Sequence, residues 1–232
     1  MILVFAALLL GATPFEPVAI NDMSEERGML TATVVNRHSS PITGLLVQAS
    51  VHDGKQPKAV FTRYLDVYVN AFHDKPIAPG ERVTIPVLTK ELASRWSTPA
   101  VFIAGAVFAD GTTFGSDSSI RILLGRRVAL QDEISRFRSQ LVALQGSPLV
   151  DVMSAVDDAA AQMKSAGMFL TQEELSIEGV RSQVAQWVRG AFEDAPADCP
   201  EACVGKRIDY VLRGLVIWSE EVQKGSAEGA RK

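Results

Sequence analysis

The chain has 232 residues, of which 47% are hydrophobic and 22% are charged, and its formal net charge is −4 at pH 7. This composition excludes a disordered protein, and the length is sufficient for two domains of roughly 100 residues each. Residues 13–125 carry 10 basic and 11 acidic side chains, and residues 126–232 carry 13 and 16. Without a basic domain or stripe, the counterion release that drives nucleic-acid binding has no source, so we expect neither a nucleic acid nor an anionic membrane surface as the partner.

Residues 1–12 form an uninterrupted apolar run, and a Thr-Pro-Phe-Glu-Pro sequence follows it. The run is too short to cross a bilayer core about 30 Å thick, which takes on the order of 20 residues. Its length and its small residues Gly11 and Ala12 are typical of the hydrophobic region of a signal peptide. We therefore expect residues 1–17 to be a signal peptide and leader, and the protein to be secreted or periplasmic with no integral membrane span after cleavage. A buried first strand and an uncleaved anchor are the alternatives.

Short β-like runs alternate with turn residues from residue 18 to residue 125, which is the signature of an all-β domain. Pro86 places one run at a sheet edge, because proline cannot donate a ladder hydrogen bond. Seven strands in roughly 105 residues predict an immunoglobulin-like antiparallel β-sandwich. The runs lie at residues 18–21, 29–36, 42–53, 60–69 and 81–88, and in a hairpin over residues 99–125.

The hairpin over residues 99–125 joins the two halves of the chain. Asp110-Gly111 predicts a two-residue type I′ turn, and the return strand is expected to run through residues 112–124. Residues 100–109 are apolar on both faces, whereas a sheet with one solvated face alternates apolar and polar residues. We expect one face to lie in the sandwich core and the other to be covered by the helical half of the chain or by a partner molecule. Small alanine methyl groups on an open face are the alternative.

A family resemblance lies within the same region. Residues 30–53 read LTATVVNRHSSPITGLLVQASVHD, and residues 77–81 read IAPGE. This sequence resembles the small Ig-like modules of bacterial exported proteins of the FxLYD kind, in which one strand ends in Asn, a longer strand ends in Asp and a Pro-Gly-Glu turn follows. The resemblance covers residues 28–90. It implies an extracytoplasmic binding or spacer module and transfers no catalytic residues.

The period of the apolar residues changes from 2 to about 3.5 at Arg126, which predicts a helical domain over residues 126–225. Residues 146–148, Gly-Ser-Pro, separate the first helix from the second. Thr171 and Glu174 have the spacing of a capping box at the start of the third helix. Four amphipathic helices with short connections predict a bundle or a helical cap packed on the sheet.

The predicted architecture is therefore α+β, with an N-terminal immunoglobulin-like antiparallel β-sandwich followed by a C-terminal four-helix α region. The sandwich is expected at residues 18–125 and the helices at residues 126–225. Residues 226–232 are polar and are expected to form a disordered tail.

Cys199 and Cys203 are the only cysteines, and they lie at the expected start of the fourth helix. In an exported chain this spacing predicts a local disulfide that pins the linker to the helix. One alternative is a redox or Cu(I) site, because a helix N-terminus stabilises a thiolate and two thiolates can hold a soft metal. The other alternative is a pair of unpaired, inert thiols.

The remaining candidate residues form no recognisable constellation. His38, His52 and His73 are scattered without the spacing of metal ligands, and Trp96, in the loop before the hairpin, is a possible contact residue. No nucleophile elbow, phosphate-binding glycine loop or metal-binding helix motif occurs in the sequence. We therefore expect no catalytic residues, metal or cofactor.

The sequence favours an exported, non-enzymatic interaction or structural protein that binds a protein partner or associates with itself. The alternative function is a periplasmic thiol-redox or Cu(I)-handling protein that uses Cys199 and Cys203.

Overall fold

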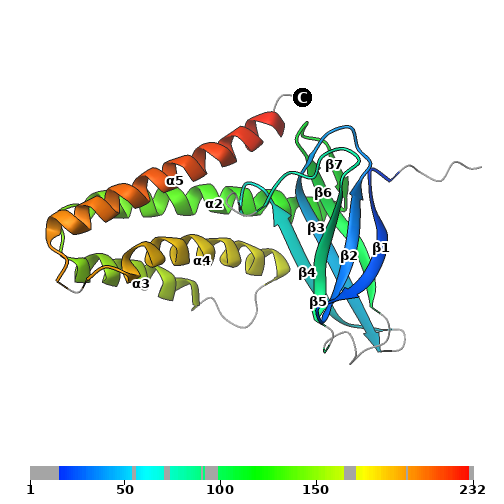
Figure 1. Cartoon of the computed structure of the whole chain (residues 1–232), viewed down its shortest axis with the longest axis horizontal. Helices are drawn as coiled ribbons and strands as arrows, with labels where there is room; N and C mark the ends of the chain where they lie inside the picture. Colours follow the sequence, from blue (N-terminus) through cyan, green and yellow to red (C-terminus); the bar gives the residue numbers. More distant parts are fainter. Residues whose placement is uncertain are drawn as a thin grey trace, which may run out of the picture.

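The structure is a computed structural model that describes residues 16–53, 56–70, 74–89, 91, 99–164, 171–196 and 198–229. These residues form seven strands followed by four helices, an α+β arrangement. In Figure 1 the strands form two sheets, and the helices extend from one side of them. We call the stranded part, residues 16–115, the β-base and the helical part, residues 117–229, the helical arm.

Two antiparallel sheets make up the β-base. One sheet has the strand order β1-β2-β5 and the other has the order β4-β3-β6-β7. β2 and β3 span the predicted ranges, and Pro86 lies on β5 at an edge of the smaller sheet, as expected. The strands are β1 (Val18–Glu26), β2 (Met29–Asn36), β3 (Ile42–Asp53), β4 (Gln56–Asp66), β5 (Arg82–Thr89), β6 (Ala100–Phe108) and β7 (Thr113–Gly115).

The inward faces of the two sheets share one apolar core. Leu45, Val47 and Ala49 of β3 belong to the same buried cluster as Ala32 and Val34 of β2. Alternate residues of β3 therefore face the core between the sheets. Each fully buried aliphatic side chain of this size contributes about 1.5–3 kcal/mol to folding, so the shared core stabilises the pairing of the two sheets.

The central hairpin differs from its prediction in two ways. Its turn is a three-residue loop, in which the N–H of Gly111 donates to the carbonyl of Phe108 at 3.0 Å and only Gly111 has a positive φ, so the type I′ assignment is wrong. The return strand β7 has three residues, and residues 117–124 are helical rather than extended. The helix begins there because the side chain of Ser116 accepts from the N–H of Ser119 as an N-cap.

The outer face of β6 is covered in part by helix α2 (Asp117–Ala143), one of the predicted alternatives. Ala104 and Val107 of β6 form a buried cluster with Ile122 and Leu123 of α2. The cover does not reach Phe102, which is 43% exposed. The first turns of α2 therefore attach the helical arm to the β-base by direct apolar packing.

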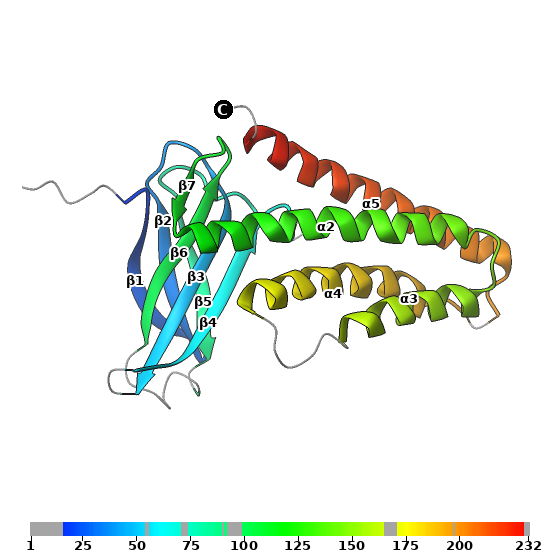
Figure 2. The same cartoon turned by 180° about the vertical axis from the view of Figure 1, so that it is seen from behind.

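Three more helices complete the arm: α3 (Leu149–Lys164), α4 (Gln172–Glu193) and α5 (Glu201–Gly229). α2 leads away from the sheets and α5 returns toward them beside it (Figures 1 and 2). The predicted capping box of Thr171 and Glu174 is present at the start of α4. α5 continues to Gly229, so the first residues of the predicted tail are helical. The predicted apolar face of α5 is buried at Val204, Ile208, Val211, Leu215, Trp218 and Val222.

Some predictions concern parts of the chain outside the described residues. These parts are residues 1–15 of the predicted leader, residues 230–232 of the predicted tail, Trp96, His73 and the side chain of His52. None of the helices in the described part of the chain combines the length and the hydropathy that a membrane span requires.

Two glycines of α5 allow a test of the packing between α4 and α5. A Cβ atom at Gly214 would overlap the ring of Trp187, so we expect Gly214→Ala to lower the free energy of unfolding by about 1–3 kcal/mol. A Cβ atom at Gly205 would meet only open space. Gly205→Ala is therefore expected to raise the free energy of unfolding by about 0.5–1 kcal/mol, because alanine has the higher helix propensity. Urea unfolding measures both variants, and changes of equal sign would contradict the packing.

Candidate functional site

A loop after β4 joins the β-base to the helical arm. We call residues 66–70 the junction loop. Val67, Tyr68 and Val69 are buried in the same apolar cluster as side chains from all four helices. The sequence predicted Val67 and Val69 on a strand, but β4 ends at Asp66 and these residues lie beyond the sheet. The β-base thus supplies apolar side chains to the core of the helical arm.

A buried ion pair lies at the start of the junction loop. Nε of Arg127 on α2 donates to Oδ2 of Asp66 at 3.0 Å, and the two side chains are only 5% and 0% exposed. The same carboxylate accepts from the backbone N–H groups of Tyr68 and Val69, and Nη2 of Arg127 donates to the hydroxyl of Thr43. Burial raises the pKa of Asp66, while the Arg127 charge and the N–H of Tyr68 act in the opposite direction. The pair therefore fixes α2, β3 and the junction loop around one carboxylate.

A second arginine holds the start of α4 to the same junction. Nη1 of Arg126 donates to the carbonyl and the hydroxyl of Ser176, both at 3.2 Å, and its guanidinium lies 4.3 Å from the centre of the Tyr64 ring. Burial lowers the pKa of Arg126, and the charge of Asp66 opposes this shift. Arg126 thus links α2 to β4 and to α4.

The junction loop also makes polar contacts with α4 and α5. Nε1 of Trp218 on α5 donates to the carbonyl of Tyr68 at 2.9 Å, and this bond is buried. Nε2 of Gln183 on α4 donates to the side chain of Asn70 at 2.9 Å. Three helices of the arm are therefore bonded to one loop of the β-base, so the direction of the arm relative to the sheets is fixed by specific contacts.

Sequence reasoning missed this junction, although two features of the sequence signal it. Gly44 interrupts the apolar strand β3, and a Cβ atom there would lie 2.8 Å from Nη2 of Arg127. A glycine inside a strand is typical of such a close approach. The second signal is the adjacent pair Arg126 and Arg127, two charged residues within an apolar helical pattern.

Removal of Arg127 tests the junction. Arg127→Met leaves the Asp66 carboxylate buried without its hydrogen-bonded counter-charge, so we expect the free energy of unfolding to fall by about 3–5 kcal/mol. Asp66→Asn added to Arg127→Met removes the stranded charge, and we expect the double variant to be more stable than Arg127→Met alone. Chemical denaturation of both variants measures the difference, and a double variant of lower stability would contradict this role for the carboxylate.

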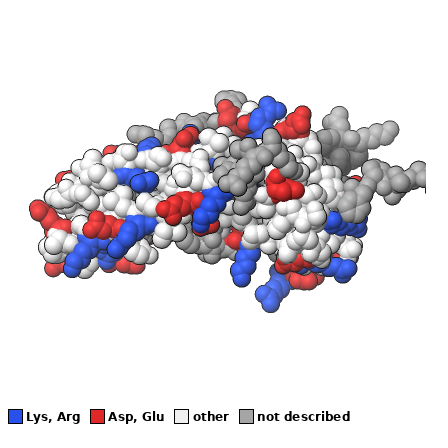
Figure 3. Space-filling model, turned by 90° about the horizontal axis from the view of Figure 1, so that it is seen from above, with Lys and Arg blue, Asp and Glu red and all other residues white. Residues whose placement is uncertain are grey.

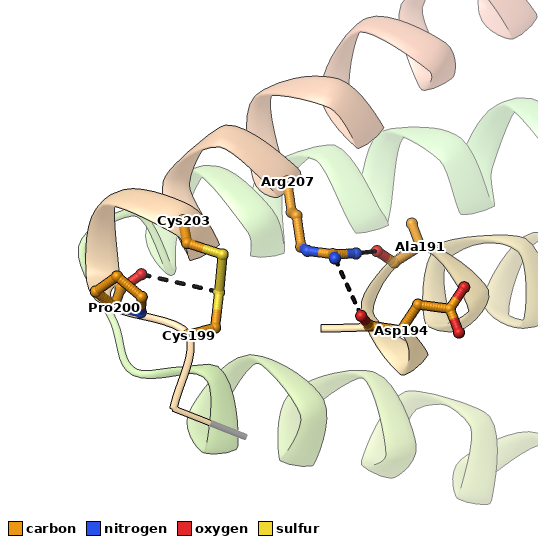
Figure 4. The surroundings of a disulfide bond; sticks show 6 residues. All are labelled: Ala191, Asp194, Cys199, Pro200, Cys203 and Arg207. Atoms are coloured by element: carbon orange, nitrogen blue, oxygen red, sulfur yellow. Dashed lines mark hydrogen bonds between the residues drawn. A yellow bond between two sulfur atoms is a disulfide. The ribbon is translucent and has the colours of Figure 1, made fainter. Parts of the chain in front are cut away.

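The two cysteines form the expected local bond. Cys199 and Cys203 are joined by a disulfide between the linker and the first turn of α5 (Figure 4). One turn further, Arg207 donates to the carbonyls of Ala191 at 2.8 Å and Asp194 at 3.2 Å. These are carbonyls at the C-terminal end of α4, which lack helical partners. The disulfide therefore closes the linker onto the first turn of α5, and Arg207 bonds α5 to the end of α4.

The disulfide lies beside a surface depression of about 750 Å³ that Cys203, Lys206 and Tyr210 border. A disulfide is present both in a structural bond and in the oxidised form of a redox pair, so the thiol-redox and Cu(I) alternative stays a prediction.

The described residues contain no group of three or more His, Cys, Asp or Glu side chains placed to hold a metal ion. His38 stacks on Phe108, with ring centres 4.1 Å apart, and its Nδ1 accepts from the N–H of Ser40.

An open groove on the helical arm is the candidate interaction site. It has a volume of about 410 Å³ and lies between α2 and α5. Val142 of α2 and Ile217 of α5 line it and are 56% and 55% exposed. Leu212 and Val216 complete its apolar lining. We call this feature the α2/α5 groove. Exposed apolar surface rimmed by polar residues is typical of a protein-binding site.

Charged side chains border the α2/α5 groove. Arg138 from α2 and Arg213 and Glu220 from α5 lie at its rim. Within the described part of the chain, neither Arg138 nor Arg213 forms an ion pair. Figure 3 shows positive and negative side chains interspersed over one face of the molecule, without a large patch of one sign. Arginine is enriched at protein–protein interfaces.

Comparisons with models of known protein families, with curated proteins and with solved structures give no match for this chain. Its function is therefore argued from the junction, the disulfide and the α2/α5 groove.

Proposed function

We propose that the chain is an exported, non-enzymatic interaction protein, in which an immunoglobulin-like β-base holds a helical arm that binds protein through the α2/α5 groove. The observation that carries the proposal is the groove itself. Its two most exposed apolar side chains, Val142 and Ile217, lie on an arm that buried contacts fix to the β-base. Exposed apolar side chains on a rigidly attached helical arm are typical of a protein-binding surface.

The strand order supports an immunoglobulin-like β-base. An immunoglobulin constant domain places its first, second, fourth and fifth strands in one sheet and its third, sixth and seventh strands in the other. The β-base has the same division except that its fourth strand, β4, lies beside β3 in the second sheet. This position brings the end of β4, and so the junction loop, next to the helical arm.

The residues that carry the FxLYD resemblance are neighbours in space. Nδ2 of the buried Asn36 donates to the carbonyls of Ser40 at 3.0 Å and Ile77 at 2.9 Å. The N–H of Gly80 donates to the carbonyl of Asn36 at 2.7 Å, and the N–H of Asn36 donates to the carbonyl of Glu81. The asparagine at the end of β2 and the Pro-Gly-Glu turn at residues 79–81 therefore form one hydrogen-bonded unit. This arrangement favours an extracytoplasmic module of this kind.

Photo-crosslinking in an exporting host tests the interaction role. A photo-crosslinking amino acid in place of Ile217 should give a protein adduct of defined mass, because this position lies in the α2/α5 groove. The matched control is the same replacement at Val150 on α3, which is 69% exposed and lies outside the groove. Absence of an adduct at position 217, or equal adducts at both positions, would contradict the proposed function.

The intact mass of the exported protein tests the compartment. A mass that lacks residues up to about position 12, with neither cysteine alkylated before reduction, is the expected result, because a cleaved leader and a closed disulfide both follow from export. A full-length mass with alkylated Cys199 and Cys203 would contradict export and would favour the thiol-based alternative.

A further inference from the structure

We infer that the occupant of the α2/α5 groove is a second copy of this chain, which docks antiparallel along α5 about a two-fold axis. This inference rests on the proposed function and names its partner. It comes from the order of charges and apolar residues along the outward face of α5.

The centre of this face has the sequence Arg213-x-x-Val216-Ile217-x-x-Glu220. Positions i, i+3, i+4 and i+7 share one face of a helix. Arg213 and Glu220 are seven residues apart, or roughly 10 Å along the helix axis at 1.5 Å per residue. Their midpoint lies between Val216 and Ile217. A cation and an anion therefore lie at equal distances from an apolar pair.

Such a pattern is complementary to itself when it is reversed. In a two-fold symmetric interface residue i contacts residue j of the second copy, and j contacts i. If the axis passes between Val216 and Ile217, Arg213 of each copy faces Glu220 of the other, and the apolar pairs meet at the centre. Two ion pairs and one apolar contact form at once, and no like charges oppose each other at these positions.

A second pair of charged positions extends the same complementarity. Asp209 and Lys224 are also exposed and are equidistant from the same midpoint, so each faces the other across the axis. In the isolated chain Lys224 forms an exposed ion pair with Glu221, and Asp209 accepts a 3.4 Å hydrogen bond from Gln145. Exposed contacts of this kind contribute little, so exchange for intermolecular pairs is inexpensive.

The α2 side of the groove supplies the remaining apolar surface. Val142 lines the same groove as Ile217, and 56% of its surface is exposed in the isolated chain. A second α5 seated against α5 and α2 covers both side chains. The four helices that meet, two from each copy, form an antiparallel bundle across the axis.

Charge reversal distinguishes this arrangement from any other dimer. In sedimentation of the full chain, we expect a dimer, and we expect Arg213→Glu or Glu220→Arg alone to weaken its association constant by at least roughly tenfold, because each places like charges opposite each other twice. The variant that carries both reversals restores the pairing and should dimerise like the natural chain. A mixture of the two single variants should form a heterodimer, because one copy then offers two anions and the other two cations.

The matched control is Arg189→Glu on α4, which breaks exposed ion pairs to Asp157 and Glu193 outside the groove and should leave the dimer unchanged. Circular dichroism confirms that each variant is folded. A monomeric natural chain, or single variants that fail to associate when mixed, would overturn the second copy as occupant. An adduct of position 217 with a different protein would then keep the proposed function, whereas no adduct at all would remove both.

Discussion

The helical arm meets the β-base around one buried ion pair, between Asp66 and Arg127. Two charges removed from water are tolerated only when hydrogen bonds satisfy them, and here the carboxylate accepts from Arg127 and from two N–H groups of the junction loop. The same contacts fix α2 at Arg127 and place the carbonyl of Tyr68 where Nε1 of Trp218 donates to it. Such a pair contributes position rather than net stability. The result is a helical arm whose direction relative to the β-base is fixed by specific contacts.

Local patterns were sufficient to predict the elements whose periodicity is strong. β2 and β3 alternate apolar and polar residues between clear turn signals, and α4 starts at a capping box. Residues 117–124 were assigned to a strand because a short apolar run fits both a buried strand and a helix. The feature that decides the outcome is the N-cap at Ser116, a local hydrogen bond that the apolar pattern does not reveal. The predicted type I′ turn at Asp110-Gly111 was wrong for a similar reason, because a single glycine is compatible with several turn types.

The site was less predictable, because it depends on residues that are distant in sequence. The disulfide could be predicted, since Cys199 and Cys203 are separated by four positions. Asp66 and Arg127 are 61 positions apart, and the local sequence around each residue does not indicate that the two side chains pair. The α2/α5 groove requires knowledge of which helices are neighbours. Ile217 is one apolar residue among several on α5, and only the packing shows that it lies outside the core.

The distance between the β-base and the helical arm shows directly whether the junction holds the arm in one direction. Spin labels at the exposed positions Val60 on β4 and Val150 on α3 report this distance when the labelled chain is diluted with unlabelled protein. We expect one narrow distance distribution for the natural chain and a wider one for Arg127→Met, because the variant loses the ion pair that fixes α2 to the junction loop while the apolar packing of α2 on β6 remains. A broad distribution for the natural chain would contradict the claim that a buried ion pair holds the arm in one direction.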